Sequence, residues 1–102
     1  MLTNTKIVDM VTAIKMGRVF LDHLIQKHLD HADIVTEVSM AKAWIGEMAN
    51  RVAYHCVQLH GGYGYMEEYP ICRFYRDARA VTIFAGSTEV MKLIVARKLD
   101  LL

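Results

Sequence analysis

Hydrophobic side chains recur every three or four residues along most of the chain, with polar side chains between them. That spacing predicts α-helices, because 3.6 residues complete one helical turn. It predicts a first helix over residues 4–29 and a second over residues 34–59, and the short connector between them favours an antiparallel pair. The expected apolar positions are Ile7, Met10, Val11, Ile14, Leu21, Leu24 and Ile25 in the first helix, and Val38, Ala41, Ile45, Met48, Ala49, Val52, Ala53 and Cys56 in the second.

Two residues predict details of these long helices. Gly17 interrupts the first helix at a cost of about 1 kcal/mol relative to alanine, unless close packing uses the gap. Asp33 is a candidate N-cap of the second helix, because its carboxylate can accept hydrogen bonds from the free amides of the next turn. The second helix carries many small apolar residues, so we expect another helix to approach it closely.

The C-terminal part of the chain predicts two shorter helices. Pro70 suits a first helical turn, where a missing amide hydrogen costs nothing. The pattern stays helical for about half of residues 70–84, and residues 85–87 break it. Ser87 then caps a last helix from Thr88 to about Leu99. That helix is expected to bury Val90, Leu93 and Ile94.

These elements predict an all-α fold, an antiparallel helical bundle in a single domain over residues 1–102. Hydrophobic residues make up 54% of the chain, above the roughly 45–50% of an average soluble domain. A small domain this apolar should cover part of its surface with a partner or a ligand. Composition therefore adds an expected interface to the helical prediction.

Charge and hydropathy exclude several classes of partner. With 12 basic residues, 11 acidic residues and a net charge of +1, the chain lacks the basic stripe of a nucleic-acid-binding domain. No run approaches the roughly 18 apolar residues that a membrane helix needs. Residues 1–6 lack the apolar core of a secretory leader. We expect a cytoplasmic protein, or a mitochondrial matrix protein in a eukaryote, with no nucleic-acid or membrane partner.

The histidines and cysteines predict no metal site. His23, His28 and His31 lie near the end of the first helix in polar surroundings, and solvent exposure explains them better than zinc. Cys56 and Cys72 are too far apart for a paired-cysteine motif, and Cys56 lies on an apolar helix face. We interpret Cys56 as a buried thiol.

Adjacent carboxylates at Glu67 and Glu68 could do acid–base chemistry. They lie in a loop with no second carboxylate pair facing them. Exposure to solvent, or an ion pair with Arg73 or Arg76, is the preferred interpretation.

Most residues that break helices gather in one stretch, "QLHGGYGYMEEYP" at residues 58–70. Two interpretations are open. The glycines either end a helix in an ordinary turn, or let the backbone approach a ligand, for which Gln58 offers a donor and an acceptor. A dinucleotide-binding fingerprint is excluded, because no strand precedes the glycines and the third glycine of that motif is absent.

Several motifs around this stretch resemble one protein family. Residues 58–99 read "QLHGGYGYMEEYPICRFYRDARAVTIFAGSTEVMKLIVARKL". They contain, in order, Gln-x-x-Gly-Gly-x-Gly-Tyr, Glu-Tyr-Pro, Arg-x-x-Arg-Asp and Gly-Ser-x-Glu before a helix ending in Ala-Arg. This series resembles the C-terminal end of the flavin-dependent acyl-CoA dehydrogenases, and "MAKAW" at residues 40–44 is similar to a long helix of the same domain. The resemblance extends from about Lys6 to the end of the chain.

The resemblance implies a fold, a cofactor and an assembly. In this family the C-terminal domain is a four-helix bundle that forms the subunit interface of a homo-oligomer, and FAD lies across that interface. The chain corresponds to about three of the four helices plus a short one. The implied FAD contacts are Gln58, Gly61 and Gly62 near the adenosine diphosphate, Phe84 beside the flavin and the acyl chain, and Ser87 and Glu89 at the start of the last helix.

The implied reaction is the α,β-dehydrogenation of an acyl-CoA thioester, an oxidoreductase step of fatty acid metabolism. It needs a carboxylate base, which many members carry directly before the glycine of the last motif. Ala85 occupies that position here, so we predict no catalytic residue in this chain. Isovaleryl- and long-chain-type members also have a small residue there and supply the base from an earlier helix.

Three functions follow as expectations. The first is the C-terminal domain of an FAD-dependent acyl-CoA dehydrogenase, present as a fragment and inactive alone. The alternative is a non-catalytic helical dimerisation or interaction module. A third is a flavin enzyme of the same fold that acts on another substrate, because fold alone does not fix the substrate.

Overall fold

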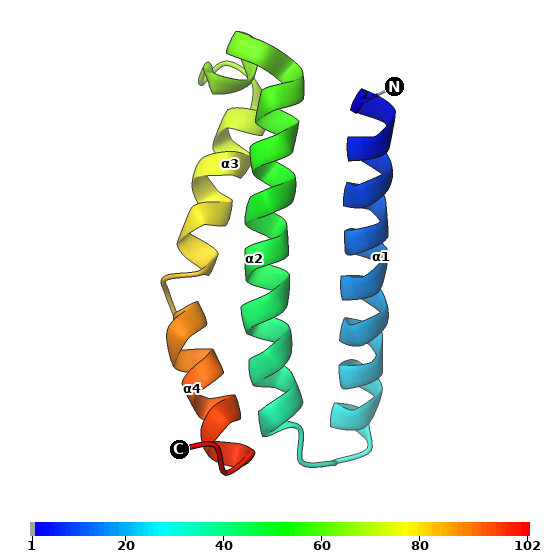
Figure 1. Cartoon of the computed structure of the whole chain (residues 1–102), viewed down its shortest axis with the longest axis vertical. Helices are drawn as coiled ribbons and strands as arrows, with labels where there is room; N and C mark the ends of the chain where they lie inside the picture. Colours follow the sequence, from blue (N-terminus) through cyan, green and yellow to red (C-terminus); the bar gives the residue numbers. More distant parts are fainter. Residues whose placement is uncertain (1) are drawn as a thin grey trace.

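The computed structural model describes residues 2–102, which form an all-α antiparallel bundle, as predicted. Figure 1 shows α2 in the middle, with α1 along one side and α3 and α4 following each other along the other side. The predicted boundaries of α1, α2 and α4 agree with the structure to within two residues, whereas α3 continues to Val81, past the predicted half of residues 70–84. The glycine-rich stretch forms a short 3₁₀ helix, η1. The elements are α1 (Leu2–Leu29), α2 (Val35–His60), η1 (Gly61–Tyr65), α3 (Pro70–Val81) and α4 (Thr88–Lys98).

The central helix α2 is covered on two sides. It contacts every other helical element, whereas α1 contacts α2 alone within residues 2–102. The sequence predicted a single apolar stripe on α2, and that prediction was too narrow because a helix between two neighbours buries two faces. Val38, predicted to be buried, is exposed. The buried residues of α2 are Ser39, Ala41, Ala43, Gly46, Met48 and Ala53.

Small side chains allow the helices to approach α2 closely. A β-carbon added to Gly17 would lie 3.1 Å from Cε of Met48 and 3.5 Å from the ring of Trp44. Gly17 therefore provides the gap into which residues of α2 pack, and its helix-propensity cost is offset by that approach.

The apolar residues of α1 divide between two faces. Leu24 is buried against α2, and the thiol of Cys56, which is half-buried, lies 3.9 Å from the sulfur of Met10. Other members of the predicted stripe remain exposed, and Val11 keeps 60% of its surface accessible. The prediction that the whole stripe is buried was wrong, because within residues 2–102 α1 packs against α2 alone and buries only the part of the stripe that faces it. Its exposed members are Ile7, Val11, Ile14, Leu21 and Ile25.

An apolar groove runs over α2 between α1 and α3. It consists of two cavities of about 440 and 510 Å³ that share Val81. Ile14 of α1 and Phe74 of α3 line one of them, and Leu21 and Ile25 of α1 line the other. The exposed apolar surface of this chain is thus concentrated in one groove of the fold.

The burial predicted for α4 was partly wrong. Val90 and Leu93 are 47% and 45% exposed, and Ile94 is half-buried. The helix instead buries Thr88 and half-buries Met91. The side of α4 that carries Thr88 and Met91 faces α2, its one helical neighbour within residues 2–102. The other sides of α4 lie on the surface of the bundle and remain exposed.

The helix ends follow local sequence signals. Ser87 caps α4 as predicted, because its hydroxyl accepts from the backbone N–H of Val90 at 3.3 Å. Pro70 begins α3, also as predicted. The cap of α2 differs from the prediction, since Ile34 occupies the N-cap position. Asp33 still contributes, because its carboxylate accepts from the N–H of Val35 at 3.2 Å.

Charged residues on the surface form ordinary ion pairs. Arg76 lies 3.1 Å from Glu67, which confirms the preferred interpretation of that carboxylate. His23 is exposed and contacts Glu37 at 3.1 Å.

Residues 2–102 contain no group of three His, Cys, Asp or Glu side chains that could hold a metal ion. No helix in the same range is long and apolar enough to cross a membrane.

Glu37 connects the end of α1 to the start of α2. Its carboxylate accepts from Nζ of Lys27 at 2.9 Å and pairs with His23. The hydrogen bond from Lys27 lowers the pKa of Glu37 below its ordinary value of 4.5, with a smaller contribution from His23. A carboxylate with a lowered pKa stabilises the fold above its unfolded-state pKa, and this stability is lost as pH falls through the folded pKa.

Glu37→Gln should therefore reduce stability at pH 7 and flatten its dependence on pH below about 4.5, because the paired charge is removed. Urea unfolding midpoints measured from pH 7 to pH 3 test this. Glu68→Gln is the matched control, since residues 2–102 contain no ion pair of Glu68. An unchanged pH dependence in Glu37→Gln would contradict the assignment.

Candidate functional site

The six residues predicted to bind a ligand lie in two separate groups. The first surrounds the end of α2, and the second occupies the connection between α3 and α4. Lys42 of α2 contacts the second group, and Gln58 belongs to the first. These two residues lie roughly 24 Å apart along the helix, at about 1.5 Å per residue. Only an extended ligand, or two ligands, can touch both groups on one chain. The groups are Gln58, Gly61 and Gly62, and Phe84, Ser87 and Glu89.

Gly61 ends α2 in a conformation that other residues avoid. Its φ of 67° and ψ of −151° fall in a region that is essentially restricted to glycine. Its backbone N–H donates to the carbonyl of Gln58. Gly61 is therefore required by the fold, and its amide is already used within the chain.

Gly62 differs from the glycines on either side of it. A β-carbon on Gly62 would meet no atom within 4 Å, and its φ is not positive. A β-carbon on Gly64 would lie 2.8 Å from the carbonyl oxygen of Val57, so close packing of η1 on α2 explains Gly64. The fold has no requirement for glycine at position 62. Bare, exposed backbone there is available to a molecule outside the chain.

Gln58 is exposed on the last turn of α2. Its side chain makes no hydrogen bond in the part of the chain that the structure describes, so both its donor and its acceptor are available. Gln58 and Gly62 together provide a polar, sterically open surface at the end of α2.

The second group lies in a tight turn. Ala85 and Gly86 have φ values of 51° and 95°, and the turn leads directly into the N-cap Ser87. Phe84 is 55% exposed, and its ring centre lies 5.6 Å from Nζ of Lys42. The turn therefore presents an aromatic face beside the start of α4.

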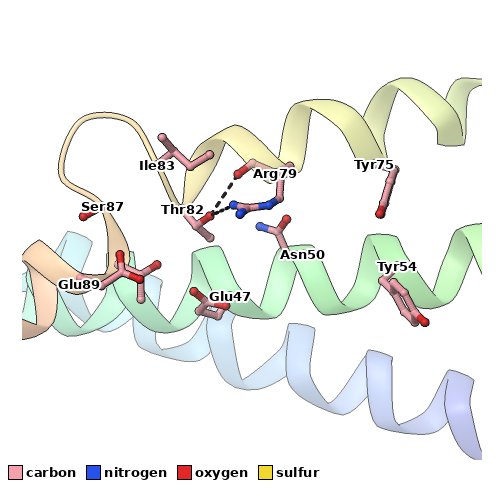
Figure 2. Close-up of a pocket in the computed structure, with 10 residues that line it drawn as sticks. Glu47, Asn50, Tyr54, Tyr75, Arg79, Thr82, Ile83, Ser87 and Glu89 are labelled. Carbon is pink, nitrogen blue, oxygen red and sulfur yellow. Dashed lines mark hydrogen bonds between the residues drawn. The ribbon is translucent and has the colours of Figure 1, made fainter.

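Ser87 and Glu89 line a pocket of about 470 Å³ between α2, α3 and α4, whereas Phe84 lies outside its lining (Figure 2). Arg79 donates to the hydroxyl of Thr82 at 2.7 Å on one wall. Glu47, Asn50 and Tyr54 from α2 and Tyr75 from α3 complete the polar walls.

The pocket contains one buried polar atom without a partner. Thr88 is 6% exposed, and its hydroxyl makes no hydrogen bond within the described residues. The carboxylates of Glu47 and Glu89 also line the pocket, with Arg79 as its cation. Two carboxylates beside one cation disfavour a free phosphate. The walls instead suit a neutral group that carries hydroxyl or N–H donors.

A family model described as acyl-CoA dehydrogenase, C-terminal domain, matches residues 1–99. The chain belongs to the acyl-CoA dehydrogenase family. Among its relatives, the mitochondrial long-chain specific acyl-CoA dehydrogenase of Sus scrofa is 47% identical over 94 residues, which cover 92% of this chain and 22% of that protein.

Two solved structures superpose closely on this chain. The acyl-CoA dehydrogenase of Geobacillus kaustophilus is 56% identical with a TM-score of 0.93, covering 95% of this chain and 26% of that one. An FAD complex of PigA is 28% identical with a TM-score of 0.89, covering 96% and 26%. The chain thus spans about a quarter of the length of the proteins it matches.

Some residues at the site carried no clear sequence signal. Asn50 donates to the carbonyls of Gly46 and Ala78 at 2.9 and 2.8 Å and joins α2 to α3. Thr88 was expected only as the start of a helix. Lys42, whose ammonium contacts the turn, lies within a helix motif in the sequence. Its position between two alanines, on a helix with many small residues, was the one signal in the sequence that another segment packs close to Lys42.

The two adjacent glycines allow a matched test. Gly61→Ala should destabilise the fold by about 1–3 kcal/mol, because alanine must adopt a conformation restricted to glycine. Gly62→Ala should change stability by less than about 0.5 kcal/mol, because the added carbon meets open space. Urea unfolding of both variants measures the difference. Equal losses would mean that the fold, and not a ligand, accounts for Gly62.

Proposed function

We propose that this chain is the C-terminal helical domain of an FAD-dependent acyl-CoA dehydrogenase, which removes hydrogen from the α and β carbons of an acyl-CoA thioester. The similarity to the Geobacillus kaustophilus acyl-CoA dehydrogenase, at 56% identity over nearly the whole chain, carries this proposal. The chain's share of the function is to hold part of FAD and to form a subunit interface.

The end of α2 suits the diphosphate of FAD. Gly62 has exposed backbone with open space around it, and Gln58 offers a free side-chain amide beside it. A bulky phosphate group can approach such a surface more closely than a surface covered by side chains. The FAD complex of PigA supports the choice of cofactor.

The α3–α4 turn suits the uncharged part of the same cofactor. Ser87 and Glu89 line the pocket and can hydrogen-bond to hydroxyl or N–H groups. Phe84 offers an exposed ring for contact with a flat apolar surface. The roughly 24 Å between Lys42 and Gln58 along α2 is consistent with one extended ligand, or with FAD molecules held between two chains.

The chain's own residues supply no base for the reaction. FAD, when bound, accepts the hydride that leaves the β-carbon. The side chain of Ala85 has no group that can take the α-proton. The carboxylate base in this proposal comes from outside the 102 residues, as the resemblance implies for long-chain-type members. Similarity to the long-chain specific enzyme of Sus scrofa supports that choice.

The exposed apolar face of α1 and α3 supports a subunit interface. Val11 and Phe74 are 60% and 66% exposed, and the groove between these helices is almost entirely apolar. Such a face is covered in most soluble proteins. We propose a homo-oligomer located in the cytoplasm, or in the mitochondrial matrix of a eukaryote. The same face also supports the alternative, a helical interaction module that binds no flavin.

A graft tests the proposed function. In it, this chain replaces the matching C-terminal segment of the Geobacillus kaustophilus acyl-CoA dehydrogenase, with the unmodified enzyme measured beside it. We expect the graft to purify with FAD and to reduce an electron-accepting dye when acyl-CoA is added. The 102 residues alone should reduce no dye, because they contain no base at position 85. Released flavin is measured by absorbance.

Two variants of the graft separate ligand binding from folding. Gly62→Asp should weaken FAD binding by at least about tenfold, because a carboxylate beside the diphosphate is repelled. Gly62→Ala is the matched control for the backbone. A folded graft that retains no flavin would reject the proposal and favour the interaction module.

Self-association of the chain gives a further test. Sedimentation should detect oligomers of the isolated chain, and Val11→Lys should shift them toward monomer because it places a charge on the apolar face. Thr12→Lys adds the same charge at the adjacent exposed position and serves as the control. Equal sedimentation of the two variants would exclude this face as the interface.

A further inference from the structure

The ammonium group of Lys42 meets three main-chain carbonyls of the α3–α4 turn. It donates to the carbonyls of Val81, Phe84 and Gly86, at 3.2 Å for Phe84 and 3.0 Å for Gly86. A lysine ammonium has three N–H donors, so all of them are used within the chain. Lys42 therefore has no donor left for a ligand, and its contribution to a site must pass through the turn.

The charge of Lys42 has no carboxylate partner. Ala41 and Ala43 on either side of it are buried, and no ion pair of Lys42 occurs within residues 2–102. The cation is stabilised instead by the carbonyl of Val81, at the negative end of the α3 helix dipole, and by the two turn carbonyls of Phe84 and Gly86. The ring of Phe84, 5.6 Å away, adds a cation–π contact.

The turn contains features that a cation can stabilise. Ala85 has a φ of 51°, a left-handed conformation that is unfavourable for a residue with a β-carbon. The carbonyl dipoles of Phe84 and Gly86 point toward the same place and repel each other without a donor between them. Lys42 is 39 to 44 residues distant in sequence from its three partners. Helix α2 therefore adds a long-range contact to a turn that also has local backbone hydrogen bonds, from the N–H of Phe84 to Ala80 and from the N–H of Thr88 to Thr82.

We propose that Lys42 is a positioning residue for the flavin site. By holding the turn, it fixes the ring of Phe84 and the start of α4, with Ser87 and Glu89, relative to α2. This inference rests on the proposed function, because these residues are assigned to FAD only there. The part that concerns the turn itself can be measured without flavin.

Amide hydrogen exchange in the full chain tests the turn. The N–H groups of Phe84 and Thr88 donate to the carbonyls of Ala80 and Thr82 and report on opening of the turn. Lys42→Met should accelerate exchange at both amides by at least about tenfold, because hydrogen bonds to a charged donor are lost. The amide of Met48 in α2 should be unaffected. A general loss of stability would instead accelerate exchange equally at the amides of Phe84, Thr88 and Met48.

Lys15→Met is the matched control, because it removes one exposed lysine charge from α1. Lys42→Arg keeps the charge if Lys42→Met does not fold. The planar donors of arginine cannot match three carbonyls around one point, so the same local acceleration is expected, to a smaller extent. Uniform exchange rates across the turn and α2 in both Lys42 variants would overturn the proposal.

The graft then connects the turn to flavin. Lys42→Met in the graft should weaken FAD binding by about tenfold, as judged by flavin release, while Lys15→Met should not. If the wild-type graft holds FAD and Lys42→Met holds it equally well, the positioning role is wrong and the proposed function stands. A wild-type graft without FAD rejects the proposed function, and this inference with it.

Discussion

Close approach of neighbouring helices to both sides of α2 is the constraint on which the fold depends. The buried positions of α2 are mostly small residues such as Ala41, Gly46 and Ala53, and Gly17 provides the matching gap on α1. Larger side chains at these positions would push the neighbours away and weaken dispersion contacts along the whole length of the helix. The core is thus a seam along one helix and not a central cluster of large residues.

Both candidate groups take their positions from this helix. The end of α2 fixes Gly61 and the open backbone of Gly62, while Lys42 fixes the turn that carries Phe84 and Ser87. The two groups differ in chemistry, because one is bare backbone and the other a polar pocket with two carboxylates. A single straight, well-packed element therefore sets the separation of two unlike surfaces. That arrangement suits an extended cofactor with a charged middle and a neutral ring system.

Sequence patterns correctly predicted the helix starts that depend on the chemistry of a single residue. Pro70 and Ser87 mark helix starts by their own chemistry, and the structure contains both starts. Burial depended on neighbours that periodicity does not identify, so Val90 and Val38 were expected inside and are exposed.

The candidate site shows the same division between local and distant causes. Family motifs identified its six residues, but their separation into two groups follows from the packing of the helices. The distinct status of Gly61 and Gly62 depends on a single dihedral angle. Lys42 escaped prediction because its partners come from the far end of the chain.

Helix α1 is attached on one side only and takes no part in the pocket at the α3–α4 turn. Within residues 2–102, α1 packs against α2 alone, and it meets α3 only across the apolar groove. Local unfolding of α1 would thus expose the seam without displacing the turn or the end of α2. The helix with one neighbouring element thus lies outside the lining of the pocket, and any covering of the groove by another helix would stabilise that helix first.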